Sequence, residues 1–552
     1  MTRSGDKVNC GFLDTFFTFV YNFGRAKSGS YANFRVQEAE LSKQEGEAPE
    51  SALIEQRLKK LEAIKELGYN PYPYRFETTH STTSLRDAFE TLEPTNEEVS
   101  IAGRLVVVRG HGKAAFADIR DGEGRFQIYV KLDIVGKDTF ALWKLLDIGD
   151  FVGVTGPVFR TRTDEMTVEV HQLQVLCKSI RPLPVPKEEV VDGERVIHDQ
   201  FADKELRYRR RYLDLALNPD VRYVFRKRSA IVSSIRSFLD ERGFLEVETP
   251  VLQPIYGGAS ARPFTTHHNT LDMQLYLRIS EELYLKRLIC GGFERVYGVS
   301  KVFRNEGIDS THNPEFTLME LYQAYADYGD MMKITESLVS EVAQSVTGSM
   351  TIEYQGQTID LSPPWDRISM LDAISDKAGI DARTAEDADL KKVCERLGGE
   401  VEDGANRGQL IDEIFDAAVA PGLVQPTFVT DYPIEMSPLA KRHRDEDRLT
   451  ERFDPFVCGG EIGNAFSELN DPIDQRQRLE HQMSLKAEGD DEAQVMDDDY
   501  VRALEHGMPP TGGLGIGIDR LVMLLTDSPS IRDVILFPHM RPEEGFGAID
   551  SE

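Results

Sequence analysis

Hydrophobic residues recur every three or four positions in the stretch that begins near Ser51. This spacing places them on one face of a helix, and Gly68 followed by Pro71 gives that helix an end. The pattern predicts a helical segment within residues 51–98, with apolar positions Ile54, Leu58, Leu61, Ile64 and Leu67. Residues 1–50 show no such period and no helix cap, so we expect a disordered and dispensable extension there.

From residue 99 the pattern changes to short β-rich runs separated by glycines and Asp-Gly turns. The expected strands cover residues 99–108, 114–119, 125–130, 151–158 and 166–175, with a helical interruption near residues 140–146. These strands favour a small barrel of the OB type over residues 99–181, a fold that binds single-stranded nucleic acid. Another five-stranded barrel would show the same pattern, so the pattern alone leaves the function open.

Residues 182–220 contain prolines and then many charges, which is typical of a linker or hinge. A long helix over residues 222–242 and a strand follow, and strands and helices then alternate. Residues 370–424 are more helical and acidic and are expected to form an insertion. The chain is therefore expected to have an α+β fold, with a second domain over residues 221–552.

The length of 552 residues leaves room for two or three domains. Acidic residues outnumber basic ones by 94 to 64, and the net charge of −30 argues against nonspecific nucleic-acid binding by the whole surface. A local basic groove is compatible with this charge. Basic residues collect at positions 208–212 and 222–228, and we first interpret these clusters as solvated faces.

The five cysteines are scattered without paired spacing, so the sequence indicates neither a disulfide framework nor a zinc site and favours a reducing compartment. The apolar run over residues 12–21 is too short to span a bilayer, and no transmembrane segment is predicted. Basic residues within the first 35 positions are compatible with a targeting peptide. A loose extension or a misplaced start codon is the favoured interpretation.

Three separated segments carry the residues that a nucleotide site needs. An arginine beside an acid, a polar loop and an aromatic ring can bind a phosphate, the edge of an adenine and its face. A glycine-rich strand that ends in arginine can close the other side, because absent side chains let a flat nucleotide lie against the backbone. The segments are Phe303-Arg304-Asn305-Glu306-Gly307, His312-Asn313-Pro314-Glu315-Phe316 and Gly513-Leu514-Gly515-Ile516-Gly517-Ile518-Asp519-Arg520.

Each segment alone is weak evidence. An isolated pair such as Arg304 and Glu306 is more often a surface ion pair. The glycines follow the spacing G-x-G-x-G, which differs from a dinucleotide-binding fingerprint, and no second half of such a site is evident in the sequence.

In order along the chain, these segments resemble motifs 2 and 3 of class II aminoacyl-tRNA synthetases, and residues 243–250 resemble motif 1. The resemblance implies that Arg304 binds the α-phosphate and the attacking carboxylate, and that Phe316 and Arg520 sandwich the adenine. It implies that Glu306 contacts the adenine amino group and His312 the outer phosphates. Arg304 and Arg520 are the implied catalytic residues, and the implied ATP-binding set is Arg304, Glu306, His312, Asn313, Phe316, Asp454, Glu461 and Arg520.

The same family binds magnesium through carboxylates that match Asp454 and Glu461. Oxygen ligands suit a magnesium ion that bridges phosphates. The family has glutamate at the first of these positions, so the shorter Asp454 leaves its direct ligation open.

The amino-acid pocket is expected to be acidic, because a buried ammonium group needs anionic partners. Glu282, Glu320 and Glu468 supply them and match lysine-binding positions of the lysyl-tRNA synthetase family, which the chain resembles from about residue 55 to 543. The complete lysine-binding set implied by the resemblance is Gly258, Glu282, Arg304, Glu320, Tyr322, Asn464, Phe466 and Glu468.

In the predicted barrel, Phe116 and Gln127 stand where related synthetases stack on and hydrogen-bond the central anticodon base, with Arg104 and Glu169 as weaker candidates. Stacking combined with contacts to base edges is how single-stranded loops are recognised. A core aromatic is the alternative interpretation of Phe116.

The resemblance implies a cytoplasmic, homodimeric lysine-tRNA ligase without a membrane segment, which uses ATP, lysine, tRNA(Lys) and Mg²⁺. Aspartyl and asparaginyl synthetases share the motifs but would need different partners at Glu282 and Glu468. A ligase that modifies a protein lysine would lack the barrel. An inactive paralogue that binds tRNA or regulates is opposed by the intact motif residues.

Overall fold

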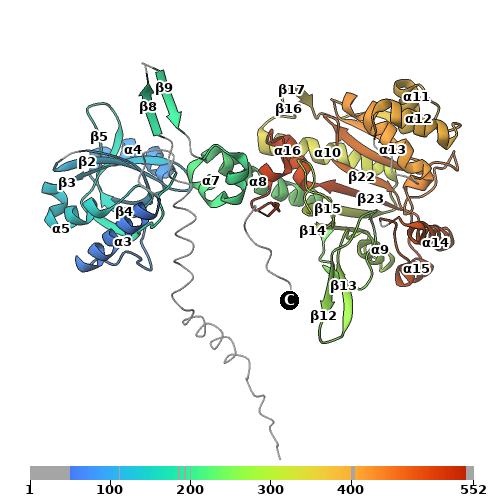
Figure 1. The fold of residues 1–552 in the computed structure, drawn as a ribbon, viewed down its shortest axis with the longest axis horizontal. Coiled ribbons are helices and arrows are strands. Elements are labelled where there is room, and N and C mark those ends of the chain that lie inside the picture. Colours follow the sequence, from blue (N-terminus) through green and yellow to red (C-terminus); the bar gives the residue numbers. More distant parts are fainter. Residues whose placement is uncertain are drawn as a thin grey trace, which may run out of the picture. The chain divides into compact units, whose positions relative to one another are not determined.

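The structure is a computed structural model that describes residues 50–542 except 111, 185–186, 192–193, 199–200, 400–404 and 491. The predicted extension of residues 1–50 lies outside this range apart from Glu50. The chain divides into two compact units, residues 1–200 and 201–552 (Figure 1). Within the described residues, no helix has the length and apolar character needed to cross a membrane.

The first unit is built on a seven-stranded sheet in the order β5-β6-β3-β2-β1-β4-β7. Two helices precede it, α3 (Glu50–Glu66) and α4 (Thr82–Leu92), and the Ser81 side chain caps α4. The remaining elements are β1 (Val99–Arg109), β2 (Ala114–Arg120), β3 (Arg125–Lys131), α5 (Leu132–Leu145), β4 (Phe151–Gly156), β5 (Val158–Arg160), β6 (Met166–Glu169), β7 (Gln172–Cys177) and the hairpin β8 (Lys187–Val191) and β9 (Glu194–His198).

Five strands were expected here, and the last two expected runs are each broken in two. Pro157 separates β4 from β5, because proline has no N–H to donate to a sheet. Alternate side chains of the strands fill one core, which includes Ile101, Ile119 and Ile128. The other face of the sheet is thereby left for polar and aromatic residues.

A buried lysine joins the barrel to the chain that follows it. Lys178 has no exposed side-chain surface, and its Nζ atom lies 2.6 Å from Asp147 Oδ2 and 2.8 Å from Asp150 Oδ2. Asp150 Oδ1 also accepts a hydrogen bond from the Ser179 backbone N–H at 2.8 Å. Such a buried cation requires both acids, since an unpaired charge inside a protein is costly.

The second unit contains a nine-stranded sheet in the order β10-β14-β15-β23-β22-β20-β19-β18, with β21 paired to β20. Its central pairs are antiparallel, whereas β10 with β14 and β18 with β19 are parallel. The strands are β10 (Leu245–Glu246), β14 (Arg295–Phe303), β15 (Glu315–Ala324), β18 (Asp366–Ser369), β19 (Thr427–Thr430), β20 (Arg452–Val457), β21 (Gly460–Glu461), β22 (Gly463–Ser467) and β23 (Thr511–Gly517).

Helices α8 (Pro219–Glu241), α10 (Tyr328–Thr347) and α16 (Ile518–Leu525) pack with one face of this sheet into a single apolar core. Smaller sheets are formed by β11 (Leu252–Gln253), β12 (Thr265–His268) and β13 (Met273–Leu277), and by β16 (Thr351–Tyr354) and β17 (Gln357–Asp360). Further helices of this unit include α9 (Glu282–Cys290), α14 (Pro472–Glu488), α15 (Asp498–Glu505) and α17 (Ile531–Val534).

The stretch expected to be helical over residues 370–424 contains α11 (Met370–Ala378), α12 (Asp387–Leu397) and α13 (Arg407–Ala418). These helices share a core of their own with residues of β19 and β20. Figure 1 shows them together at one end of the large sheet.

The expected linker over residues 182–220 differs from the structure. From Lys204 onward this stretch forms α6 (Lys204–Arg209) and α7 (Arg211–Leu217), which belong to the second unit. Arg211 is only 2% exposed, and it pairs with Asp214 at 2.7 Å and donates to the Arg532 carbonyl oxygen at 2.7 Å. The interpretation of residues 208–212 as a solvated face is therefore wrong at Arg211, because its charge is matched inside the unit.

Candidate active site and nucleic-acid-binding face

A cavity of about 520 Å³ lies on the face of the large sheet opposite the apolar core. Alternation along the strands creates this division, because successive side chains point to opposite faces. On β15, Met319 and Leu321 enter the core, whereas Glu320 and Tyr322 line the cavity. The predicted residues that line it are Gly258, Glu282, Arg304, Glu306, His312, Asn313, Phe316, Glu320, Tyr322, Glu461, Asn464, Phe466, Glu468 and Arg520.

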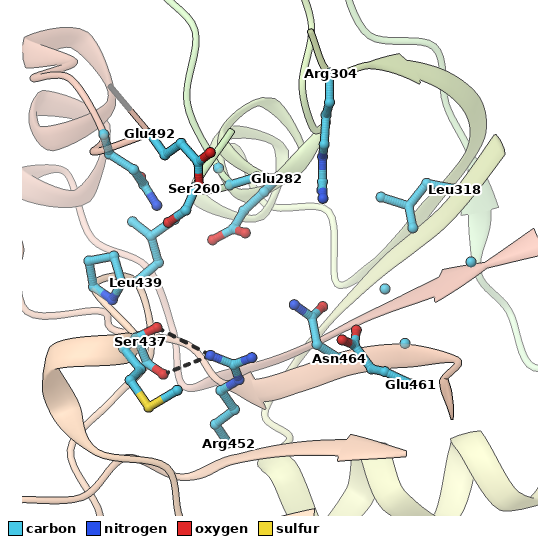
Figure 2. Close-up of a pocket in the computed structure, with 18 of the residues that line it drawn as sticks. Ser260, Glu282, Arg304, Leu318, Ser437, Leu439, Arg452, Glu461, Asn464 and Glu492 are labelled. Carbon is cyan, nitrogen blue, oxygen red and sulfur yellow. Dashed lines mark hydrogen bonds between the residues drawn. The ribbon is translucent and has the colours of Figure 1, made fainter. Parts of the chain in front are cut away.

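Arg304 projects into the cavity from the loop after β14. Figure 2 shows the Arg304 and Glu282 side chains reaching in from one side, and Asn464 and Glu461 lying on the opposite side. The Arg304 guanidinium carbon lies 5.1 Å from the centre of the Phe316 ring, and its Nε atom has no hydrogen-bond partner among the described residues. Burial lowers the pKa of Arg304, and the carboxylates of Glu306 and Glu320 oppose that shift. The site thus presents a cation with unused donor capacity.

The polar loop after Arg304 is held by its own hydrogen bonds. His312 Nδ1 lies 2.8 Å from Asp309 Oδ2, and this contact helps to lower the pKa of Asp309 against the effect of burial. Asn313 is buried, donates to the Glu315 carbonyl oxygen at 2.6 Å and accepts from the His539 backbone N–H at 3.1 Å. Both ends of the Asn313 amide are therefore used to shape the loop.

Arg520 closes the far side of the cavity. Its Nη1 atom donates to the Glu461 carbonyl oxygen at 2.7 Å and lies 4.0 Å from Glu461 Oε2. Burial raises the pKa of Glu461, as does the nearby Asp454, whereas Arg520 lowers it. An acid and an arginine thus share one wall of the cavity.

Asp454 is not among the residues that line the cavity. It is 3% exposed, and its two oxygens accept hydrogen bonds from Arg452 at 3.0 and 2.7 Å. Among the residues that the structure describes, no group of three His, Cys, Asp or Glu side chains could hold a metal ion by itself. Glu461 is the carboxylate of the pair that faces the cavity, and direct ligation by Asp454 stays a prediction.

Three buried acids gather at the other end of the cavity. Glu282, Glu320 and Glu468 are 6%, 5% and 1% exposed. Glu320 accepts hydrogen bonds from Ser280 Oγ at 2.8 Å and from the Glu281 backbone N–H at 2.9 Å. Burial, with added repulsion from Glu281 and Glu282, raises the pKa of Glu320 to about 8. This end of the cavity is suited to a cationic ligand.

Two glycines keep the acidic end compact. Gly258 has a φ of +89°, and a Cβ atom there would lie 2.9 Å from both Ser280 Oγ and Glu282 Cβ. A Cβ atom at Gly513 would collide with Glu468 Oε1 and would lie 2.7 Å from Tyr322 Cε1. Gly513 was predicted to make room for a nucleotide, and the structure shows that it makes room for these two side chains.

Lys286 is the main residue that the sequence analysis did not identify. Its side chain is fully buried, and Nζ donates a hydrogen bond to Glu282 Oε1 at 2.5 Å and forms an ion pair with Glu468 Oε2. Spacing could have indicated the first contact, because Glu282 and Lys286 are four residues apart on α9. The contact with Glu468 depends on the tertiary fold.

Two further segments contribute walls that the sequence analysis left without a role. One is the start of α13, and the other is the chain after α14. Asp412, from the first of these, has its pKa raised to about 6 by burial and by repulsion from Asp416. The contributed residues are Asn406, Gly408, Gln409 and Asp412, and Asp490, Glu492, Ala493 and Gln494.

The outer face of the barrel in the first unit carries three neighbouring rings. Phe116 and Tyr129 are cross-strand partners with ring centres 4.6 Å apart, and Phe159 lies 6.1 Å from Tyr129. Phe116 is partly exposed, whereas its neighbours Ala115 and Ala117 are buried. The interpretation of Phe116 as a core aromatic is therefore wrong.

Of the other residues predicted for this face, Gln127 and Glu169 lie on strands beside the rings and Arg104 lies further along the sheet. Gln127 accepts a hydrogen bond from Thr167 Oγ1 at 2.8 Å, and Glu169 is the cross-strand partner of Tyr129. Arg104 is the cross-strand partner of Arg120, which lies four residues along β2 from Phe116. The Arg104 guanidinium carbon lies 4.3 Å from the centre of the Phe151 ring.

Arg109 is the cross-strand partner of Phe116 and was not identified from the sequence. A bulge in β1 between Leu105 and Val107 shifts the register, so alternation counted from Leu105 gives the wrong face for Arg109. Its guanidinium donates to Asp118 Oδ2 at 2.9 Å while its side chain stays 60% exposed. The three rings and Arg109 form a surface suited to stacked bases and phosphate.

Each of the two units matches the model of a known protein family. Residues 203–541 match the model of tRNA synthetases class II (D, K and N), and residues 99–183 match the OB-fold nucleic acid binding domain. The fold and the cavity thus define a class II tRNA synthetase with an OB-fold domain, which confirms the predicted α+β fold class.

Similar proteins identify the family within this class. The chain is 56% identical to the lysine-tRNA ligase of Moorella thermoacetica over 498 residues, which cover 90% of this chain and 99% of the relative. It is 54% identical to that of Carboxydothermus hydrogenoformans, covering 89% and 98%, and 53% identical to that of Clostridium novyi, covering 90% and 96%. The chain belongs to the lysine-tRNA ligase family.

Proposed function

We propose that this protein is an ATP-dependent lysine-tRNA ligase. The single observation that carries the proposal is the arrangement of one cavity, in which Glu282, Glu320 and Glu468 form an acidic end and Arg304, Arg452 and Arg520 stand elsewhere along its walls. Lysine has two ammonium groups for the acids and a carboxylate for Arg304. Aspartate or asparagine would leave buried carboxylates without a cation, which is costly.

In the first step, a lysine carboxylate oxygen bonds to the α-phosphorus of ATP. The bond from that phosphorus to the bridging oxygen breaks, and pyrophosphate leaves with the electron pair. Arg304 binds both the carboxylate and the α-phosphate, and Phe316 and Arg520 hold the adenine between them. Such alignment and charge neutralisation supply most of the catalysis in phosphoryl chemistry.

Mg²⁺ is the proposed metal. Glu461 supplies a carboxylate at the cavity wall, and magnesium commonly binds one or two carboxylates together with substrate phosphates. The ion would neutralise charge on the phosphates. Arg452 holds both Asp454 oxygens, so we assign Asp454 the role of orienting Arg452 beside the metal site.

In the second step, the 3'-hydroxyl of the terminal adenosine of tRNA attacks the lysyl carbonyl carbon, an ester forms and AMP leaves. Recognition of tRNA(Lys) is proposed for the outer face of the barrel, where Phe116 stacks on an anticodon base and Gln127 bonds its edge. We propose that residues 99–181 form the anticodon-binding domain. The catalytic domain then includes α6 and α7 and extends to the end of the described chain.

A cytoplasmic homodimer is the proposed state. Strand β10 is an edge strand of the large sheet as far as the described residues extend, and Leu245 and Leu252 remain 47% and 48% exposed. An isologous interface would cover such a surface twice. Light scattering on the active enzyme should give twice the chain mass, and an active monomer at working concentration would contradict the proposal.

Lysine-dependent exchange of pyrophosphate into ATP tests the first step, and charging of tRNA(Lys) tests the second. Glu468→Gln should lower lysine-dependent exchange by about ten- to a hundredfold, because a charge-assisted hydrogen bond contributes roughly 1.5 to 3 kcal/mol. The KM for ATP should change little. Preferred activation of aspartate, or no exchange at all, would overturn the proposal and favour another synthetase or an inactive paralogue.

A further inference from the structure

Lys286 lies behind the acidic end of the cavity and is not among the residues that line it. It reaches from α9 to contact one oxygen of Glu282 and one oxygen of Glu468, and none of its side chain is exposed. The rings of Phe466 and Tyr500 lie 5.3 and 6.0 Å from Nζ. The ammonium group is therefore enclosed by two acids and two aromatic rings.

This lysine leaves part of Glu468 for another cation. Lys286 Nζ contacts Oε1 of Glu282 and Oε2 of Glu468. Glu468 Oε1 is buried and has no hydrogen-bond partner among the described residues. Buried polar atoms are rarely left unpaired. An unpaired carboxylate oxygen beside a cavity therefore indicates that a bound ligand donates a hydrogen bond to it.

Charge balance gives the same result. Three carboxylates face the acidic end, from Glu282, Glu320 and Glu468, and when all three are ionised in the lysine complex Lys286 neutralises one of the three charges. Two negative charges remain, which equals the number of ammonium groups on a lysine molecule. Without Lys286, three buried carboxylates would meet two ammonium groups.

The titration of these groups depends on Lys286. Burial leaves the pKa of Glu282 raised and that of Glu468 raised further, and Lys286 is the largest influence that limits each rise. Burial lowers the pKa of Lys286 itself, but the facing carboxylates more than reverse this, so Lys286 stays protonated. The titratable groups that interact with Lys286 are Glu282 and Cys290 on α9, Glu468 after β22, and Tyr500 on α15, whereas Glu320 and Tyr322 on β15 interact with the two acids.

We infer that Lys286 is a positioning residue: its ammonium group, held between Glu282 and Glu468, favours their ionised forms in the empty site and thereby makes the site selective for an ε-ammonium group over a neutral side chain of the same length. The inference rests on the lysine site proposed above. It assigns the discrimination to an internal counter-cation as well as to the acids that would touch the substrate.

The test compares the wild-type enzyme with Lys286→Met, which keeps the length of the side chain and removes its charge. Calorimetry of lysine binding at pH 7, in two buffers of different ionisation enthalpy, counts the protons released. We expect the wild-type enzyme to release no more than about one, from Glu320, if Lys286 holds the other two acids in their ionised forms. Lys286→Met should release about one more, because acids protonated in the empty site must then ionise.

Kinetics give a second reading. In Lys286→Met the KM for lysine should rise roughly ten- to a hundredfold at pH 7 and should fall as the pH rises, whereas the KM for ATP should stay close to wild type. Selectivity for lysine over norleucine, which has the same carbon chain without the ammonium group, should drop by about tenfold or more. Lys286→Arg, which restores the charge, should return the proton count to the wild-type value.

The matched control is Lys178→Met, because Lys178 is also a fully buried lysine between two acids, and those acids, unlike Glu282 and Glu468, do not line the cavity. It should lower the thermal midpoint without changing the proton count or the KM for lysine. A wild-type release of two or more protons would overturn the inference even if Lys286→Met failed to fold. An unchanged lysine KM and proton count in a folded Lys286→Met would overturn it as well.

The proposed lysine site can fail separately. If Glu282→Gln and Glu468→Gln both leave the KM for lysine unchanged, the site is misplaced. If they raise this KM while Lys286→Met does not, the site stands and the role of Lys286 is refuted.

Discussion

Gly513 on β23 lies against the carboxylate of Glu468 so closely that a Cβ atom at position 513 would collide with Glu468 Oε1. Gly513→Ala should therefore displace Glu468 or Tyr322 and raise the KM for lysine by about tenfold or more, with a smaller effect on the KM for ATP. Pyrophosphate exchange at varied lysine concentration measures this. Gly422→Ala, at a glycine with open space around it, should behave as wild type.

The pH dependence of stability should report on Glu320. Its pKa is raised from 4.5 to about 8 in the folded protein, so unfolded chains lose this proton at lower pH than folded ones do. The contribution of Glu320 to stability therefore falls as the pH rises from about 4.5 to 8.

Glu320→Gln has no proton to lose, and its amide can still accept from the Glu281 N–H and donate to Ser280 Oγ. The thermal midpoint of this variant relative to wild type should increase between pH 5 and pH 8, while activity is lost. A difference that stays constant over this pH range would contradict the assignment.

Replacing both Phe116 and Gln127 by alanine should weaken the use of tRNA while pyrophosphate exchange stays nearly intact, because the two residues belong to the first unit and the cavity to the second. Loss of base stacking costs roughly 1 to 3 kcal/mol, so the KM for tRNA should rise about tenfold or more. Equal loss of both activities would mean that these residues only support the fold.

Arg109 and Arg104 should differ in their contribution to tRNA binding. Arg109 faces Phe116 across the sheet and is largely exposed, whereas Arg104 is directed to Phe151 and donates to the Gly149 carbonyl oxygen. Arg109→Ala should raise the KM for tRNA more than Arg104→Ala does. The reverse order would support the candidate drawn from the sequence.

Glu461 and Asp454, the two acids that the family resemblance links to the metal, should differ in their effect on the Mg²⁺ requirement. Glu461→Gln should raise the Mg²⁺ concentration required for pyrophosphate exchange, because Glu461 faces the cavity. Asp454→Asn should mainly lower thermal stability, because it weakens the two contacts with Arg452 in a buried setting. A larger shift in Mg²⁺ requirement for Asp454→Asn would show direct ligation.

The sequence was sufficient for the motifs and the strand pattern of the barrel, because these depend on local order along the chain, and the resemblance to a known family then supplied most residues of the cavity. Contacts between distant segments were not accessible in this way. The pair of Lys286 and Glu468 joins residues far apart in the chain, and Arg211 was misread because its carbonyl partner belongs to Arg532.

One contact that was not predicted could have been derived from the sequence. Arg452 and Asp454 are two residues apart on one strand and therefore share a face, which predicts their contact. Arg109 could not be placed by alternation, since the bulge in β1 reverses the parity of the positions beyond it.

Because the acidic end of the cavity is buried, the binding of lysine and the binding of tRNA should respond differently to salt concentration. Glu468 is 1% exposed and its charge interactions lie away from mobile ions, so lysine recognition should be nearly indifferent to ionic strength. Arg109 and Arg125 on the barrel are more than half exposed, and contacts between such side chains and a polyanion weaken steeply as salt rises. At high salt the enzyme should therefore keep making adenylate after it has stopped charging tRNA.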